Sequence, residues 1–208
     1  MGEMLPIVVV GLGNPGAEYA NTRHNAGAMV IDRLLERVKR IERRQHKWNS
    51  SVWGVRHAGR ELLLVRPLTY MNNSGQAVGR LQRALGLVPQ DILVVYDCID
   101  LPFGRLRMRS KGGSGGHRGM ESVIQVLGAR NFPRLRVGVG RKADHDVAEY
   151  VLDGWSTEEQ ARLQRVLDAA VDAVLYATRA GVERAMNRYN SWSLNGEADD
   201  NNKKENVS

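Results

Sequence analysis

The fold is decided by the stretch Ile7-Val8-Val9-Val10-Gly11-Leu12-Gly13-Asn14-Pro15-Gly16. Its apolar half predicts a buried β-strand, because an unbroken apolar run suits a strand that is covered on both faces. The glycines that follow allow a sharp turn and a close approach of the backbone to a ligand. Tyr19 and Arg23-His24-Asn25 come next. A titratable imidazole just beyond a glycine-lined strand end indicates reaction chemistry there.

The spacing of Gly11, Gly13 and Gly16 also fits the G-x-G-x-x-G fingerprint of dinucleotide-binding proteins. In that motif a helix begins at once and its N-terminus holds the pyrophosphate. Here Pro15 disfavours helical angles at the preceding residue, and helical periodicity starts only near Ala26. A nucleotide-cofactor enzyme is therefore the weakest of three function classes considered for this chain, the other two being a cofactor-free enzyme and a non-catalytic binding protein, and no cofactor is predicted.

Apolar runs and helical periodicities alternate along the rest of the chain. Further strands are expected at 51–56 and 61–66, which read as a hairpin, and at 92–96, 106–109 and 135–140. Helices are expected from about 26 to 38, before Gly86, from 120 to 127, after the capping box at 156–159, and up to about 189. This alternation predicts one α/β domain, residues 1–192, with a mixed, largely parallel twisted sheet covered by helices on both faces. Residues 193–208 are expected to form a polar, disordered tail.

Composition limits the function further. The 208 residues contain no apolar run long enough to span a membrane, and the N-terminus lacks the pattern of a signal peptide. The lone Cys98 excludes an intramolecular disulfide and a cysteine-based zinc cluster. We therefore expect a cytoplasmic protein. The formal charge of +7 favours an anionic partner such as nucleic acid.

Two groups of basic residues stand out. Five cations between Arg37 and Arg44 are expected at the end of the first helix. Arg105, Arg107 and Arg109 alternate along an extended segment, which places them on one face of a strand. Like charges so close repel one another, so this second group suggests an anion-binding surface.

Polar side chains follow several of the predicted strands. Asn14 and His24 follow the first strand, Asn72 follows the hairpin, Asp97 ends the 92–96 strand, and His117 lies in a glycine-rich loop. Ligands of such sheets gather at the carboxyl ends of the strands. We therefore expect these side chains to line one cleft.

Together these segments resemble the bacterial peptidyl-tRNA hydrolase family. The matching segments are 11–16 with Tyr19, 22–27, 66–67 with 70–72, 96–97 with 100–104, 112–119 and 134–140. The resemblance covers residues 7 to 189. It implies a monomeric α/β enzyme that hydrolyses the ester between peptide and tRNA in peptidyl-tRNAs released from ribosomes, so that the tRNA is recycled. It also implies that the reaction uses no metal and no cofactor.

The resemblance assigns roles residue by residue. His24 would be the general base that activates water, oriented by Asp97. Asn14 would polarise the carbonyl and, with Asn72, bind the peptide and the terminal adenosine. The other expected contacts with the substrate are Tyr19, Met71, His117 and Arg118. Arg109 and Arg136 would bind the 5′-phosphate of the acceptor end. The positive field for the tRNA backbone would be extended by Arg105, Arg107, Lys111 and Arg134.

The chain departs from the family pattern in two places. Arg118 stands where the family usually has Asn, and Tyr96-Asp97-Cys98 stands where it usually has His-Asp-Glu. His117 is a second candidate for the base. An RNA-binding relative that has lost catalysis is therefore the main alternative to the hydrolase.

Overall fold

The computed structural model describes residues 7–38, 41–142, 144–194 and 196. The strands are β1 (Ile7–Gly11), β2 (Ile41–Lys47), β3 (Ser50–His57), β4 (Arg60–Pro67), β5 (Ile92–Cys98), β6 (Leu106–Arg109) and β7 (Arg134–Gly138). The α-helices are α1 (Ala26–Arg37), α2 (Ser74–Leu85), α3 (Arg118–Leu127), α4 (Val147–Leu152), α5 (Thr157–Ala180) and α6 (Val182–Tyr189).

The strands form one sheet in the order β2-β3-β4-β1-β5-β7-β6. The four central strands, β4-β1-β5-β7, run parallel to one another. The hairpin strands β2 and β3 on one side and β6 on the other pair antiparallel. The predicted mixed sheet is therefore confirmed, with its parallel pairings at the centre. The predicted 51–56/61–66 hairpin is also present, as β3 and β4.

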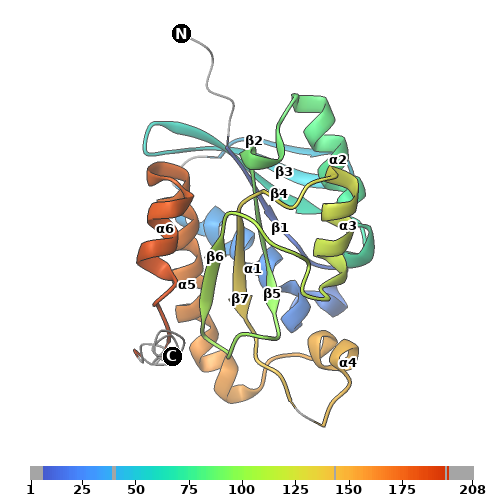
Figure 1. Cartoon of the computed structure of the whole chain (residues 1–208), viewed down its shortest axis with the longest axis vertical. Coiled ribbons are helices and arrows are strands. Elements are labelled where there is room, and N and C mark those ends of the chain that lie inside the picture. The colour runs from blue at the N-terminus through green and yellow to red at the C-terminus, as the bar shows by residue number, and fades with distance from the viewer. Residues whose placement is uncertain (1–6, 39–40, 143, 195, 197–208) are drawn as a thin grey trace, which may run out of the picture.

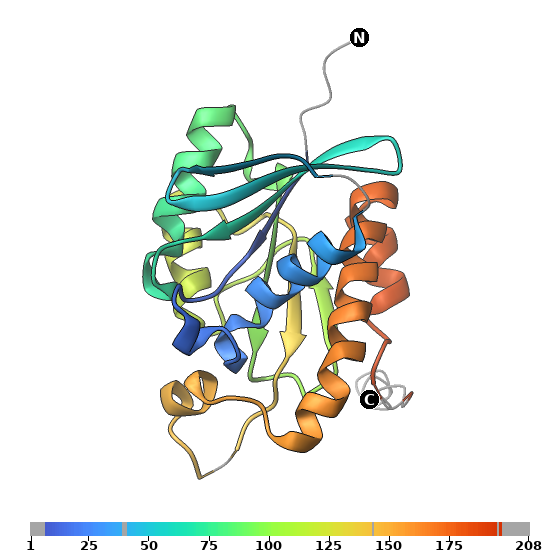
Figure 2. The same ribbon diagram turned by 180° about the vertical axis from the view of Figure 1, so that it is seen from behind.

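Helices cover both faces of the sheet (Figures 1 and 2). On one face α1, α5 and α6 enclose a core with side chains such as Ile31, Leu64 and Val174. On the other face α2 and α3 enclose a second core with Val10, Leu81 and Met120. In Figure 2, α1 crosses the sheet and α5 stands beside it. Both faces of the central strands are thus buried, which explains their unbroken apolar runs.

The glycines of the opening motif allow tight packing of the chain on itself. A Cβ atom on Gly11 would meet the carbonyl oxygen of Gly27 in α1, and one on Gly27 would meet that of Val95 in β5. A Cβ on Gly13 would lie 2.8 Å from the side chain of Ala28. Gly11 and Gly13 of the fingerprint, together with Gly27, therefore serve the packing of α1 against the sheet.

Helices α2 and α3 lie side by side and run in the same direction. A Cβ on Gly75 would meet the carbonyl oxygen of Ser122, and one turn later a Cβ on Gly79 would meet the side chain of Val126. The backbone N–H of Gly75 also donates to Ser122 Oγ at 3.0 Å. Because both helices begin at the carboxyl edge of the sheet, their first residues meet there.

Three expectations from the sequence are corrected. The first helix ends at Arg37, and Arg43 and Arg44 lie in the exposed edge strand β2 instead of a helix end, while Lys39 and Arg40 lie outside the described residues. Helix α4 was not predicted; Asp146 caps it by accepting from the N–H groups of Ala148 and Glu149. The ordered chain also extends past 192, because Leu194 is buried and its N–H donates to Gly104.

The rest of the predicted tail, 195 and 197–208, lies outside the described residues. Within the described part of the chain, no helix has the length and apolar character needed to cross a membrane.

Candidate active site

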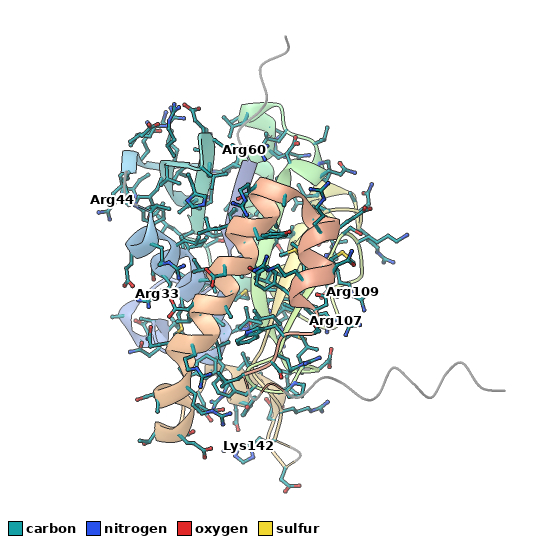
Figure 3. The ribbon with its side chains drawn as sticks, turned by 90° about the vertical axis from the view of Figure 1, so that its left-hand side faces the viewer. Arg33, Arg44, Arg60, Arg107, Arg109 and Lys142 are labelled. Atoms are coloured by element: carbon teal, nitrogen blue, oxygen red, sulfur yellow. The ribbon has the colours of Figure 1, made fainter. Side chains whose placement is uncertain are left out.

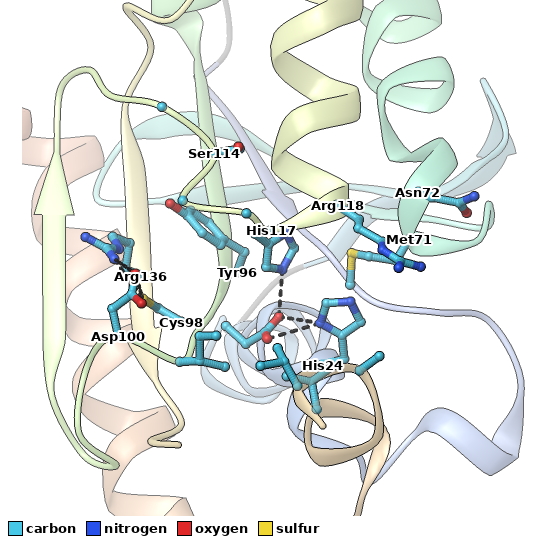
Figure 4. Close-up of a pocket in the computed structure, with 18 of the residues that line it drawn as sticks. His24, Met71, Asn72, Tyr96, Cys98, Asp100, Ser114, His117, Arg118 and Arg136 are labelled. Atoms are coloured by element: carbon cyan, nitrogen blue, oxygen red, sulfur yellow. Dashed lines mark hydrogen bonds and ion pairs between the residues drawn. The ribbon is translucent and has the colours of Figure 1, made fainter. Parts of the chain in front are cut away.

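A pocket of about 910 Å³ opens at the carboxyl ends of the parallel strands (Figure 4). The loop after β1, the end of β5, the glycine-rich loop before α3, and α4 each form part of its wall. Nine of the predicted site residues line it: Asn14, His24, Met71, Asn72, Asp97, Arg109, His117, Arg118 and Arg136. The expectation that residues far apart in sequence share one cleft is confirmed.

Asp97 is the centre of the site, and two imidazoles converge on its buried carboxylate. His24, in the short 3-10 helix Arg23–Asn25, has its Nδ1 2.9 Å from Oδ1 and 3.1 Å from Oδ2 of Asp97. His117 has its Nε2 2.8 Å from the same Oδ1. The two rings have their centroids 4.9 Å apart. One carboxylate therefore orients both histidines.

The hydrogen bonds assign different tautomers to the two rings. His117 caps α3, and its Nδ1 accepts from the backbone N–H of Met120 at 3.1 Å. Its Nε2 must then carry the proton that is donated to Asp97. His24 donates through Nδ1, so its Nε2 keeps a lone pair. His24 is thus able to accept a proton, whereas both ring nitrogens of His117 are already committed.

The ionisation of Asp97 follows from the same contacts. Burial alone would raise the pKa of this carboxyl group. The attraction of His117 and His24, together with their hydrogen bonds, outweighs burial and holds the pKa below its ordinary value. Asp97 is therefore a carboxylate at neutral pH and stabilises a positive charge on His24.

Asn14 is held with its amide nitrogen available. Its Oδ1 accepts from the backbone N–H of Met71 at 2.7 Å, which identifies the other side-chain atom as the Nδ2 donor. The side chain of Asn25 fixes the backbone of Asn14 on both sides, accepting from its N–H at 2.8 Å and donating to its C=O at 3.0 Å. The sequence predicted no role for Asn25; in the structure it holds Asn14 in place.

The glycine-rich loop before α3 is pinned by a buried arginine. Nη1 of Arg134 donates to the carbonyl oxygens of Gly112 and Gly113, at 2.8 and 3.0 Å, and Nη2 donates to that of Arg130 at 2.9 Å. Arg134, expected to extend the positive field, is buried beside the pocket with these donors used for the loop. Its charge is used inside the protein, where it gives the loop a fixed shape.

The arginines of β6 and β7 differ in what they contact. Arg136 donates to Cys98 Sγ at 2.9 Å and to Asp100 Oδ2 at 3.1 Å, and Arg109 is exposed on the pocket wall. Arg105 precedes β6 and is buried, so its expected place in an exposed row is wrong. Figure 3 shows Arg107 and Arg109 together at one edge of the molecule, apart from the other labelled cations.

One predicted site residue lies outside the pocket, and one wall of the pocket was missed. Tyr19 does not line the pocket; its carbonyl accepts from Thr22 N–H and Oγ1. Val147, Val151 and Leu152 of α4 form an apolar part of the wall. The Asp146–Glu149 capping pattern was the available signal for that helix.

The three converging side chains also have the composition of a metal site. His24, Asp97 and His117 bring ligand atoms within 4.8 Å of one another. Metal bonds of about 2.0 Å would separate the ligand atoms of a tetrahedral site by about 3.3 Å. The nitrogen–oxygen distances here, 2.8 and 2.9 Å, are those of direct N–H···O hydrogen bonds. The residues therefore fit a proton-sharing network better than a metal centre.

Comparisons with known proteins show what the whole chain is similar to. The model of the family described as Peptidyl-tRNA hydrolase matches residues 8–198. The chain is 47% identical to the peptidyl-tRNA hydrolase of Aquifex aeolicus over 90% of this chain and 97% of that protein. It is 48% identical to that of a Synechococcus strain over 93% and 87%. The crystal structure of peptidyl-tRNA hydrolase from Acinetobacter baumannii superimposes with a TM-score of 0.84 and 32% identity, covering 93% of this chain and 100% of that one.

Proposed function

The chain belongs to the peptidyl-tRNA hydrolase family, and from this premise we propose that it hydrolyses the ester that joins a peptide to the terminal ribose of tRNA. The products are a free peptide, whose new carboxyl group loses its proton to solvent, and a tRNA with a free ribose hydroxyl. The released tRNA re-enters translation.

His24 is the general base of the proposed reaction. Its Nε2 takes a proton from a water molecule while the water oxygen attacks the ester carbonyl. Asp97 fixes the tautomer through Nδ1 and stabilises the imidazolium that forms. The imidazolium then returns its proton to the departing ribose oxygen. This step completes the cycle with the histidine neutral again.

Asn14 stabilises the carbonyl oxygen as it becomes negative. Its Nδ2 is the donor left over after Oδ1 binds Met71 N–H, and it lines the same pocket as His24. A fixed donor at a developing oxyanion contributes about 3 to 4 kcal/mol in other hydrolases. Asn72, exposed at the mouth of the pocket, binds the terminal adenosine in this proposal.

Arg109 and Arg136 bind the 5′-phosphate of the acceptor end. Nη2 of Arg136 donates to Cys98 and Asp100, and the other guanidinium N–H groups remain available to phosphate oxygens. Arg109 is exposed on the neighbouring strand β6, two residues beyond Arg107, which pairs opposite Arg136. The proposal also includes a monomeric enzyme in the cytoplasm, and sedimentation of the purified protein tests its oligomeric state.

The observation that carries the proposal is the buried Asp97 carboxylate that orients a histidine with one unused ring nitrogen. A protein that only binds RNA does not require such an arrangement. The hydrolase is therefore favoured over the non-catalytic relative.

Release of labelled peptide from an N-acetylated aminoacyl-tRNA tests the proposal. Wild type should release the label, and His24→Ala should lower kcat by at least about 100-fold, the usual contribution of a general base. His57→Ala removes an imidazole from the end of β3, outside the pocket, and should leave the rate unchanged. A wild-type protein that binds the tRNA without releasing label would show the non-catalytic RNA binder instead.

A further inference from the structure

The pocket contains an arginine that has no role in holding the protein together. Arg118 is exposed and lines the pocket, and within the described part of the chain its side chain makes no hydrogen bond or ion pair. Arg134 and Arg136, in the same lining, both make contacts inside the protein. Figure 4 shows Arg118 running from the start of α3 toward Met71, on the same side as the His24 ring.

The position of Arg118 in its helix adds to this contrast. It is the first residue of α3, directly after the cap His117. The N-terminus of a helix carries partial positive charge, so a cation there is unfavourable for the helix itself. Neither helix stability nor a neighbouring acid thus explains a guanidinium at this position. An anion that enters with the substrate does.

We propose that Arg118 binds the phosphodiester that joins the terminal adenosine of tRNA to the nucleotide before it. The inference rests on the proposed function and adds a specific contact to it. In the substrate this phosphodiester is the fixed negative charge nearest to the scissile ester. Arg118 lines the same pocket as His24, and in Figure 4 its side chain lies on the same side as the His24 ring, where the ester must be held.

The arrangement of charge across the pocket agrees with this assignment. In Figure 4, Arg136 and Arg118 lie on opposite sides of the two histidines. Arg136 with Arg109 serves the proposed 5′-phosphate site, and Arg118 serves the 3′ strand. Two anchors on opposite sides of His24 would align the ester with its Nε2. A planar guanidinium suits this task because it meets two phosphate oxygens at once.

Binding of two small ligands tests the assignment without relying on catalysis. Adenosine lacks the phosphodiester, and the dinucleotide cytidylyl-adenosine contains it. In Arg118→Met, which keeps side-chain bulk without charge, the affinity for the dinucleotide should fall about tenfold while that for adenosine stays constant. Arg118→Lys should recover part of the loss. Arg184→Met, which removes the same charge from the exposed face of α6, should bind both ligands as wild type does.

Kinetics on the matching esters provides the second readout. N-acetyl-aminoacyl esters of adenosine and of the dinucleotide differ only in the nucleotide part. Arg118→Met should lower kcat/KM for the dinucleotide ester about tenfold and leave the adenosine ester unchanged. An equal loss on both esters would place Arg118 at the carbonyl oxygen or the peptide and overturn the assignment. An unchanged dinucleotide affinity would overturn it as well. If wild type hydrolyses neither ester, the proposed function fails, and the binding experiment still decides the role of Arg118.

Discussion

Replacing Asp97 by Asn changes the active site without changing its shape. The carboxylate accepts from two imidazoles, and an amide of the same size offers one acceptor and one NH2 group. His117 must donate through Nε2, because its Nδ1 accepts from Met120. The amide oxygen therefore takes the Oδ1 position, still 2.9 Å from Nδ1 of His24, and the NH2 group takes the Oδ2 position, 3.1 Å from the same Nδ1. The NH2 group competes for Nδ1 as a donor, so the variant also admits the tautomer of His24 with its proton on Nε2, which is the wrong atom.

The cost of Asp97→Asn is the sum of a lost charge and a wrong tautomer. A carboxylate and an imidazolium about 4 Å apart attract by about 4 kcal/mol at an effective dielectric constant of about 20. Since about 1.4 kcal/mol corresponds to a tenfold change in rate, losing this attraction alone slows the reaction about 1,000-fold. The tautomer adds to the loss. A comparable substitution in a serine protease lowers kcat about 10⁴-fold.

Single-turnover release of peptide from N-acetylated aminoacyl-tRNA measures this loss directly. We expect a rate between about 10³- and 10⁴-fold below wild type, with tRNA affinity unchanged. Circular dichroism and a urea titration confirm that the variant is folded. A folded variant that loses less than tenfold in rate would refute the claim that Asp97 orients His24 and stabilises its positive charge.

Three further outcomes are expected. The folded pKa of Asp97 lies below its ordinary value, so its charge stabilises the fold above about pH 4 and this contribution is lost as the pH falls. Between pH 5 and pH 2, the free energy of unfolding measured with urea should therefore fall more steeply for wild type than for Asp97→Asn. Gly75→Ala should lower the free energy of unfolding by about 1 to 3 kcal/mol, because the new Cβ meets the Ser122 carbonyl. Gly113→Ala, with open space around it, should lower it little, and equal losses would contradict the packing argument. In Arg109→Gln, the slope of log kcat/KM against log salt concentration should become shallower by about 0.7 to 0.9 with tRNA substrates, and an unchanged slope would show that Arg109 contacts no phosphate.

The sequence predicted the central sheet well because its signals are local. Four successive apolar residues before Gly11 require a strand that is buried on both faces, and the hairpin turn at 57–60 sets the pairing of its two arms. The run after Arg37 gave no such signal. An exposed basic segment has the same composition in a helix and in an edge strand, so the strand β2 was missed.

The roles of the site residues were also hard to predict from local sequence signals. Arg109 and Arg134 are paired opposite each other on neighbouring strands, yet one lies at the surface and the other holds the glycine-rich loop. His24 and His117 both contact Asp97, yet one backbone N–H, from Met120, separates their chemical roles. Each difference depends on a contact between segments distant in sequence, which spacing and composition do not encode.

The close contact of α2 with α3 has a consequence for protein engineering. Met71 begins the 3-10 turn Met71–Asn73 that leads into α2, and His117 directly precedes α3, so the glycine contacts between the helices fix these two halves of the active site relative to each other. A chimera that takes only one of the two segments from a relative would combine surfaces that were shaped for different neighbours. Exchanging residues 71–82 and 117–127 as one block keeps the helix interface intact, and this pair of segments is therefore the smallest unit for transplanting substrate preference between members of the family.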